Sequence, residues 1–303
     1  MKYADYDLHL HTQWSYDAFT TLDEIFEMAR NRKTKAFAIT DHHLMDAYSE
    51  IDITAEKFPE VSYIAGAELT VHSPLGTFDM VCLGMPVVPD DNIKNVLEMY
   101  RSWQQSYGKA QSANLCRLGY KFDDADRLAL LQSYRPQKAI AKQGTTHVKF
   151  EILFEKVFSL GAKPDANGIP DVFNHFEGLP DYPEYDKVIP AVKAAGGTVF
   201  IAHPYHYFNK LDRRRMDEMK EMLDFDGIEC AHPSVPDEAS AILRQYCLEN
   251  KLLSSAGSDM HQATAVRSNT RPTEFTGHIG DTKWLDEILE RVTLFNGKQG
   301  FKY

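Results

Sequence analysis

The chain has few of the features that mark membrane, secreted or basic nucleic-acid-binding proteins. Its 303 residues contain no apolar run near the roughly 20 residues that a membrane helix needs. The formal net charge of −11 argues against broad binding to nucleic acid, so we expect no stable nucleic-acid complex. The four cysteines have no paired spacing and no Cys-x-x-Cys motif: Cys82, Cys116, Cys230 and Cys247. Reduced thiols are typical of a cytoplasmic protein.

Targeting segments, internal repeats and low-complexity tracts are not evident either. The first residues, Met1-Lys-Tyr-Ala-Asp-Tyr6, include no apolar segment of the signal-peptide kind. We therefore expect a cytoplasmic protein with no membrane partner. The length and the 43% hydrophobic content suit one large domain or a barrel with an insertion.

Short apolar runs alternate with segments of helical periodicity. Strands are predicted at 36–40, 61–68, 78–84, 198–202, 227–231 and 252–257. Helices are predicted at 20–30, 45–57, 186–195, 213–223, 236–249 and 281–292. This alternation favours a parallel α/β architecture.

The segment from about residue 91 to 185 interrupts the alternation. Helices are predicted at 91–118, 123–134 and 147–160, followed by a loop rich in Pro, Gly and acidic residues at 163–171. We therefore predict a barrel domain over 1–90 and 186–303, with 91–185 as a helical insertion that stands over the barrel mouth.

Polar residues able to bind metal follow most of the predicted strands. In Asp7-Leu-His-Leu-His-Thr12, the two imidazoles lie at positions i and i+2, so an extended chain directs both to one side. The further polar residues that follow apolar runs are Asp41, His42, Glu68, His203, Asp259 and His261. Catalytic groups gather at the carboxyl ends of parallel strands, and imidazoles with carboxylates bind divalent metals. The pattern therefore predicts a metal site.

Five motifs in this order resemble the polymerase and histidinol phosphatase (PHP) family of metal-dependent phosphoesterases. They are Asp7-Leu-His-Leu-His-Thr12, Ile39-Thr-Asp-His42, Gly66-Ala-Glu68, Ile201-Ala-His-Pro204 and Gly257-Ser-Asp-Met-His261. The insertion and the segment Gly227-Ile-Glu229 are most similar to the subgroup that acts on nucleotides and short oligonucleotides. The resemblance implies a distorted (β/α)7 TIM-like barrel and a trinuclear site with two or three divalent ions, Zn, Mn or Fe.

The resemblance also implies the ligands of each ion. One ion is held by His9, His11, Glu68 and Asp259. Glu68 bridges to a second ion, which is also held by His203 and Asp79. The third is held by Asp17, His42 and His261. Asp79 stands where the subgroup usually has histidine, and this harder ligand favours Mn or Fe over Zn. Asp17 comes one residue later than in the family pattern, so its role requires a local bulge.

The implied reaction is attack on phosphorus by a hydroxide that the metal ions activate, with Glu68 bridging them. His232 is a candidate proton donor to the leaving group, and Asp7 and Asp41 are expected to orient imidazoles. His147 stands where related proteins have a histidine beside a phosphate-binding arginine, which Gly144-Thr-Thr146 does not supply. His72 and His278 are expected at the surface.

Three functions remain open on the sequence alone. The first is a phosphoesterase acting on a small phosphorylated substrate, such as a nucleotide or a short oligonucleotide. The second is a histidinol-phosphate or other small-metabolite phosphatase, and the third is a non-catalytic, metal-stabilised accessory module. A metal-dependent deaminase or amide hydrolase fits the order of the motifs poorly.

Overall fold

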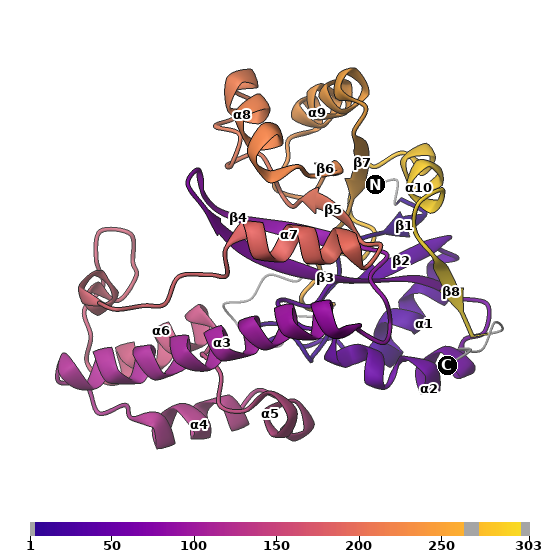
Figure 1. Cartoon of the computed structure of the whole chain (residues 1–303). Coiled ribbons are helices and arrows are strands. Elements are labelled where there is room, and N and C mark those ends of the chain that lie inside the picture. The colour runs from indigo at the N-terminus through magenta and orange to yellow at the C-terminus, as the bar shows by residue number, and fades with distance from the viewer. Residues whose placement is uncertain (1–3, 264–272, 298–303) are drawn as a thin grey trace. The chain divides into compact units, whose positions relative to one another are not determined.

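The protein consists of two compact units in the computed structural model, which describes residues 4–263 and 273–297. The first unit comprises Met1–Leu97 and Pro183–Tyr303, and the second comprises Glu98–Tyr182. Figure 1 shows the elements of both units. That the helical segment serves as a lid over the barrel stays a prediction.

The first unit is built on a sheet of eight strands. Their order follows the chain, with a last strand added beside β3: β1 (Tyr6–Asp7), β2 (Ala36–Ile39), β3 (Ser62–Ser73), β4 (Gly76–Leu83), β5 (Thr198–Ile201), β6 (Gly227–Ala231), β7 (Leu253–Ala256) and β8 (Leu294–Asn296). In Figure 1 β3 and β4 form a long hairpin. Strands β2, β5, β6 and β7 are buried along their whole length.

The sheet is mostly parallel, as predicted, but β4 runs antiparallel to both β3 and β5. The reason is local, because only Pro74 and Leu75 separate β3 from β4 and so short a connection can join only antiparallel strands. The reversal matters for the site. The first half of β4 lies beside the last half of β3, where Asp79 pairs with Thr70.

The first and last strands of the sheet are joined by hydrogen bonds. The amide of Leu8 donates to the carbonyl of Ala256 in β7, and Leu10 forms a parallel bridge with Met260. On its other side the same segment accepts a hydrogen bond from the amide of Thr40, which follows β2. The two edges of the sheet therefore meet, as the predicted distorted seven-stranded barrel requires.

Helices of the first unit pack against this sheet. They are α1 (Leu22–Arg32), the 3₁₀ helix η1 (Asp46–Ser49), α2 (Ile51–Lys57), α7 (Tyr185–Ala194), α8 (Arg213–Leu223), α9 (Asp237–Asn250) and α10 (Thr282–Leu289). Helix α1 begins with a capping box in which Thr21 and Glu24 bond each other's backbone amides, and it ends at Lys33 in the left-handed region. Helix α7 contacts β5, α9 contacts β6, and α10 contacts β7.

The regular elements of the second unit are helices. Its helices are α3 (Asp91–Arg117), which begins in the first unit, α4 (Asp124–Gln132), α5 (Gln137–Gln143), α6 (Phe150–Ser159) and η2 (Asp171–His175). Tyr100 and Trp103 of α3 are buried, so these two side chains serve packing. Among the described helices, none has both the length and the apolar character for a membrane span.

Candidate metal centre

The motif residues of the first unit lie at the same end of the sheet, where most of the parallel strands have their carboxyl ends. His9 and His11 lie in the extended segment after β1, with Leu8 and Leu10 buried on its opposite side. The remaining motif residues lie on or after the neighbouring strands: His42 after β2, Glu68 within β3, Asp79 within β4, His203 after β5, His232 after β6, and Asp259 and His261 after β7. Glu68 lies mid-strand because β3 continues to Ser73 in its hairpin with β4.

One group of donors comprises His9, His11, Glu68 and Asp259, which we call the His9 group. Oε2 of Glu68 lies 3.1 Å from Nε2 of His9 and 3.3 Å from Nε2 of His11. Oδ1 of Asp259 lies 3.4 Å and 3.0 Å from the same two nitrogens. Tetrahedral zinc with bonds of about 2.0–2.1 Å separates its ligand atoms by about 3.3 Å. The spacing of the His9 group therefore fits one metal ion.

A second group, the Asp79 group, comprises Glu68, Asp79 and His203. Nε2 of His203 lies 3.1 Å from Oε1 of Glu68 and 3.7 Å from Oδ2 of Asp79. Glu68 thus presents one carboxylate oxygen to the His9 group and the other to the Asp79 group, which is the arrangement of a bridging ligand.

A third group, the His42 group, comprises His11, Asp17, His42 and His261. Oδ2 of Asp17 lies 3.0 Å from Nε2 of His261 and 3.4 Å from Nε2 of His42. The additional residue before Asp17 is taken up in a turn, where the Ser15 hydroxyl donates to Oδ1 of Asp17. The structure therefore brings Asp17 to the other donors, while its role as a ligand stays a prediction.

Several of these atoms are buried without a hydrogen-bond partner among the described residues. They include Nε2 of His9, Nδ1 of His42 and Oε2 of Glu68. Nε2 of His9 and Oε2 of Glu68 are 3.1 Å apart and yet do not form a well-directed hydrogen bond. Buried polar atoms are normally paired, so donor atoms that converge without pairing fit residues arranged around a cation.

The charges of the site are strongly coupled. Burial alone would lower the pKa of His9, but the surrounding carboxylates, Glu68 first, raise it well above its usual value. The same competition raises the pKa of His42 to about 10 and that of His203 to about 9. Burial would raise the pKa of Glu68, but His42 and His9 lower it well below its usual value. Glu68 is therefore ionised and needs positive charge beside it, from protons or from metal ions.

Glu229 is a site residue that the sequence reasoning missed. It lies buried in β6, and its Oε1 is 3.0 Å from Nδ1 of His9. Its Oε2 accepts the backbone amide of His203 at 2.6 Å. Since Nε2 of His9 faces the metal-ligand atoms, Glu229 fits the carboxylate that orients a ligating imidazole. Its only sequence signal is the Gly227-Ile-Glu229 segment.

Asp7 and Asp41, to which that orienting role was assigned, do not perform it. Asp7 accepts the backbone amides of Ser258 and Thr276, and Asp41 accepts the amide and the hydroxyl of Thr12. Both carboxylates brace the loops that carry the imidazoles. Burial raises the pKa of Asp41 to about 7.

The remaining predicted histidines fall in different surroundings. Nε2 of His232 lies 3.5 Å from Oδ2 of Asp259, which brings His232 to the edge of the His9 group. His147 lies in the second unit, buried between the rings of Trp103 and Tyr107 at 5.3 Å and 5.5 Å. The prediction that His278 is at the surface is wrong, because it is 6% exposed and its Nε2 lies 2.8 Å from the carbonyl of Tyr6.

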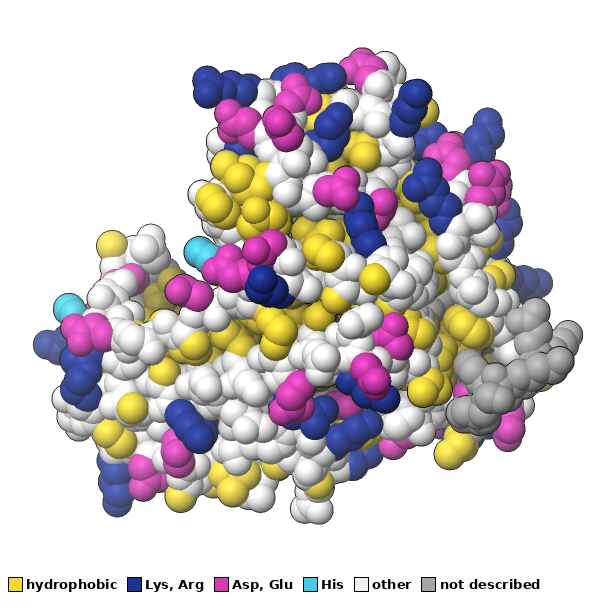
Figure 2. Space-filling model, viewed as in Figure 1, with side chains coloured by type: hydrophobic (Ala, Val, Ile, Leu, Met, Phe, Trp, Pro, Cys, Tyr) yellow, Lys and Arg dark blue, Asp and Glu magenta, His cyan; other side chains and the backbone are white. Residues whose placement is uncertain are grey.

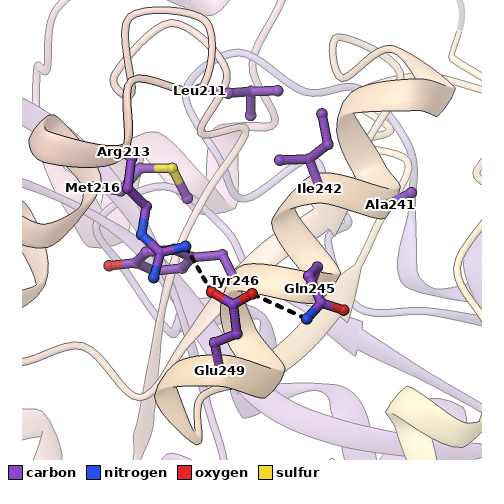
Figure 3. A pocket seen from close by; sticks show the side chains of 8 residues that line it. All are labelled: Leu211, Arg213, Met216, Ala241, Ile242, Gln245, Tyr246 and Glu249. Atoms are coloured by element: carbon purple, nitrogen blue, oxygen red, sulfur yellow. Dashed lines mark hydrogen bonds and ion pairs between the residues drawn. The ribbon is translucent and has the colours of Figure 1, made fainter.

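A pocket elsewhere in the first unit does not provide an alternative site. It has a volume of about 470 Å³ and lies between α8 and α9 (Figure 3). Its lining combines Leu211, Met216 and Ile242 with the ion pair between Arg213 and Glu249. None of its lining residues belongs to a group of metal-binding donors.

Comparison with known proteins identifies the family. A family model described as "PHP domain" matches residues 7–155. The chain contains a PHP domain. The matched segment includes His9, His11, His42 and Glu68, while the other donors, His203, Asp259 and His261, follow it in sequence.

One relative in sequence and two solved structures match most of the chain. The 5′-3′ exoribonuclease of Haemophilus influenzae is 22% identical over 265 residues, which cover 84% of this chain and 89% of the relative. A solved structure from Bifidobacterium adolescentis, assigned as a metal-dependent phosphoesterase, matches with a TM-score of 0.72 and 22% identity over 95% of this chain and 96% of that one. An amidohydrolase from Chromobacterium violaceum, solved with bound sulfate and no metal, matches with a TM-score of 0.68 and 18% identity over 97% and 98%.

Proposed function

We propose that this PHP protein is a metal-dependent phosphoester hydrolase. The observation that carries the proposal is the position of Glu68. Its two carboxylate oxygens face separate donor groups, since Oε2 lies 3.1 Å from His9 and Oε1 lies 3.1 Å from His203. A carboxylate shared in this way suits two neighbouring divalent ions, and such pairs are typical of enzymes that cleave phosphate esters.

The His9, Asp79 and His42 groups would hold the ions, which we expect to be Zn, Mn or Fe. Bound there, divalent ions would lower the pKa of water and neutralise charge on the phosphoryl group. The protein's own contribution is positional. Glu229 fixes the ring of His9 through Nδ1 and the backbone of His203 through its amide. His232, beside Asp259, is the candidate for giving a proton to the leaving oxygen.

We infer that the substrate is a small phosphorylated molecule, with a nucleotide or a short oligonucleotide as the first candidate. The exoribonuclease relative from Haemophilus influenzae supports this class. The net charge of −11 favours a short substrate over long nucleic acid. On the face drawn in Figure 2, acidic and basic side chains are also interspersed rather than separated by sign. A contact between His147 and the substrate and a cytoplasmic location stay predictions.

A small-metabolite phosphatase is the second candidate, because Gly144-Thr-Thr146 lacks the arginine that related nucleotide-acting proteins place beside His147. A non-catalytic accessory module is less consistent with the site. The described residues keep carboxylates and imidazoles in all three donor groups, and Glu68 spans two of them.

The test is phosphate release from nucleotides, short oligonucleotides and phosphorylated metabolites. The protein would be stripped of metal and reloaded with Mn, Zn or Fe. Asp259→Asn should abolish turnover, whereas Asp91→Asn, at a side chain that is 96% exposed, should not change it. Turnover of small metabolites alone would favour the second candidate. The absence of turnover with every metal, despite tight metal binding, would favour the accessory module.

A further inference from the structure

Asp79 is held by hydroxyl groups on both of its carboxylate oxygens. The Thr70 hydroxyl on β3 donates to Oδ1 at 2.5 Å, and the Tyr207 hydroxyl, from the turn after β5, donates to Oδ2 at 2.7 Å. Oδ2 is the same oxygen that lies 3.7 Å from Nε2 of His203 in the Asp79 group. The residue that departs from the family pattern therefore has a hydroxyl donor on each of its two carboxylate oxygens.

Packing fixes both of these donors. The ring of Tyr207 meets Phe78 edge to face at 5.2 Å and lies 5.8 Å from the ring of His203. Nε2 of His43 lies 2.8 Å from the Thr70 hydroxyl. Because that hydroxyl gives its proton to Asp79, the imidazole must donate to Thr70. Asp79 thus has little rotational freedom before any cation arrives.

These contacts have two consequences for metal binding. The Thr70 and Tyr207 hydroxyls hold Asp79 in the orientation that brings Oδ2 near His203, so a cation bound there meets a carboxylate that is already ordered. In addition, the Asp79 group offers only three donors, two carboxylates and one imidazole. The His42 group offers one carboxylate with the imidazoles of His42 and His261, beside His11, which it shares with the His9 group. Carboxylate-rich sites suit Mn²⁺, and imidazole-rich sites suit Zn²⁺.

We propose that Tyr207 is a positioning residue for Asp79, and that the Asp79 group is the weakest and most manganese-selective of the three metal positions. The inference rests on the proposed metal centre. Partners that orient metal ligands typically contribute 10- to 100-fold to metal affinity. Tyr207→Phe removes the hydroxyl and keeps the ring that packs on Phe78, so the fold should be retained.

The experiment is a Mn²⁺ titration of metal-stripped protein that has first received two equivalents of Zn²⁺, with free Mn²⁺ followed by electron paramagnetic resonance. Wild type should bind one further Mn²⁺, and Tyr207→Phe should weaken that step by about 10- to 100-fold without affecting bound Zn²⁺. Tyr205→Phe is the matched control, because this ring contacts His206 and its hydroxyl has no hydrogen-bond partner among the described residues. Asp79→His should convert the position into a third tight Zn²⁺ site.

The outcomes separate this inference from the proposed function. Equal Mn²⁺ affinity in wild type and Tyr207→Phe would overturn the inference while leaving the metal centre intact. Binding of three equivalents of Zn²⁺ with equal affinity by wild type would also overturn the inference and leave the metal centre intact. A wild-type protein that binds no metal would overturn both.

Discussion

Glu229→Gln tests how far the site depends on a residue that should not itself bind metal. In the native protein both oxygens of Glu229 accept hydrogen bonds, from Nδ1 of His9 at 3.0 Å and from the amide of His203 at 2.6 Å. A glutamine keeps one acceptor and replaces the other with an amide group that can only donate. One of the two native donors is then left facing another donor in a buried position, since Glu229 is 1% exposed.

The expected cost follows from this mismatch. Loss of a carboxylate that orients a ligating imidazole typically lowers metal affinity by about 10- to 100-fold, or about 1.4–2.8 kcal/mol of binding free energy. The buried unpaired donor should also lower the free energy of unfolding by about 1–3 kcal/mol. The ring of His9 loses both its orientation and a neighbouring negative charge. The loss of metal affinity should therefore be largest at the His9 group.

The assay is competition between the metal-stripped protein and a chromophoric zinc chelator, together with urea unfolding. Glu238→Gln on the exposed first turn of α9 is the matched control. Zinc affinity within twofold of wild type in Glu229→Gln would refute the reasoning, because the geometry assigns the orientation of His9 to Glu229.

Three further predictions concern protons, packing and turnover. His42 and His203, with pKa values of about 10 and about 9, hold protons at pH 7 when no metal is bound, so metal affinity measured by chelator competition should rise with pH up to about 10. The same raised values stabilise the metal-stripped fold below pH 6.5, and urea unfolding should show this stability lost as the pH rises through 9 and 10. Gly257→Ala should lower the free energy of unfolding by about 1–3 kcal/mol and reduce bound zinc, because the added Cβ would overlap the side chain of His9; unchanged thermal unfolding and metal content would contradict this. His232→Asn should lower kcat about 100-fold with metal content unchanged, and a parallel loss of metal would show that His232 is a ligand instead.

Much of the architecture is predictable from local sequence patterns. The buried strands and the amphipathic helices of the first unit lie within a few residues of their predicted limits, because apolar periodicity and capping residues act over short distances. The reversed direction of β4 has a local signal in the short Pro74-Leu75 connection, but the alternation of strands and helices does not reveal it.

In the candidate site, too, some residues are predictable from local sequence patterns and others are not. Most of the motif donors are predictable because they directly follow an apolar run, although Glu68 lies within the long strand β3. Glu229 is not predictable, because it lies inside such a run and acts through His9, 220 residues away in the sequence. His278 is misplaced for a related reason, since its burial depends on Tyr6, 272 residues away. Contacts over such distances leave no periodic pattern in a single sequence.

The most direct test of the central claim is phosphate release from a 5′-phosphorylated dinucleotide, measured alongside the number of metal ions bound per chain. The account predicts that the metal-stripped protein is inactive and that activity returns in proportion to bound metal. Asp259→Asn should lose activity and bound metal, whereas Asp91→Asn should keep both quantities. Equal rates in the stripped and reloaded proteins, or full activity in Asp259→Asn, would contradict it.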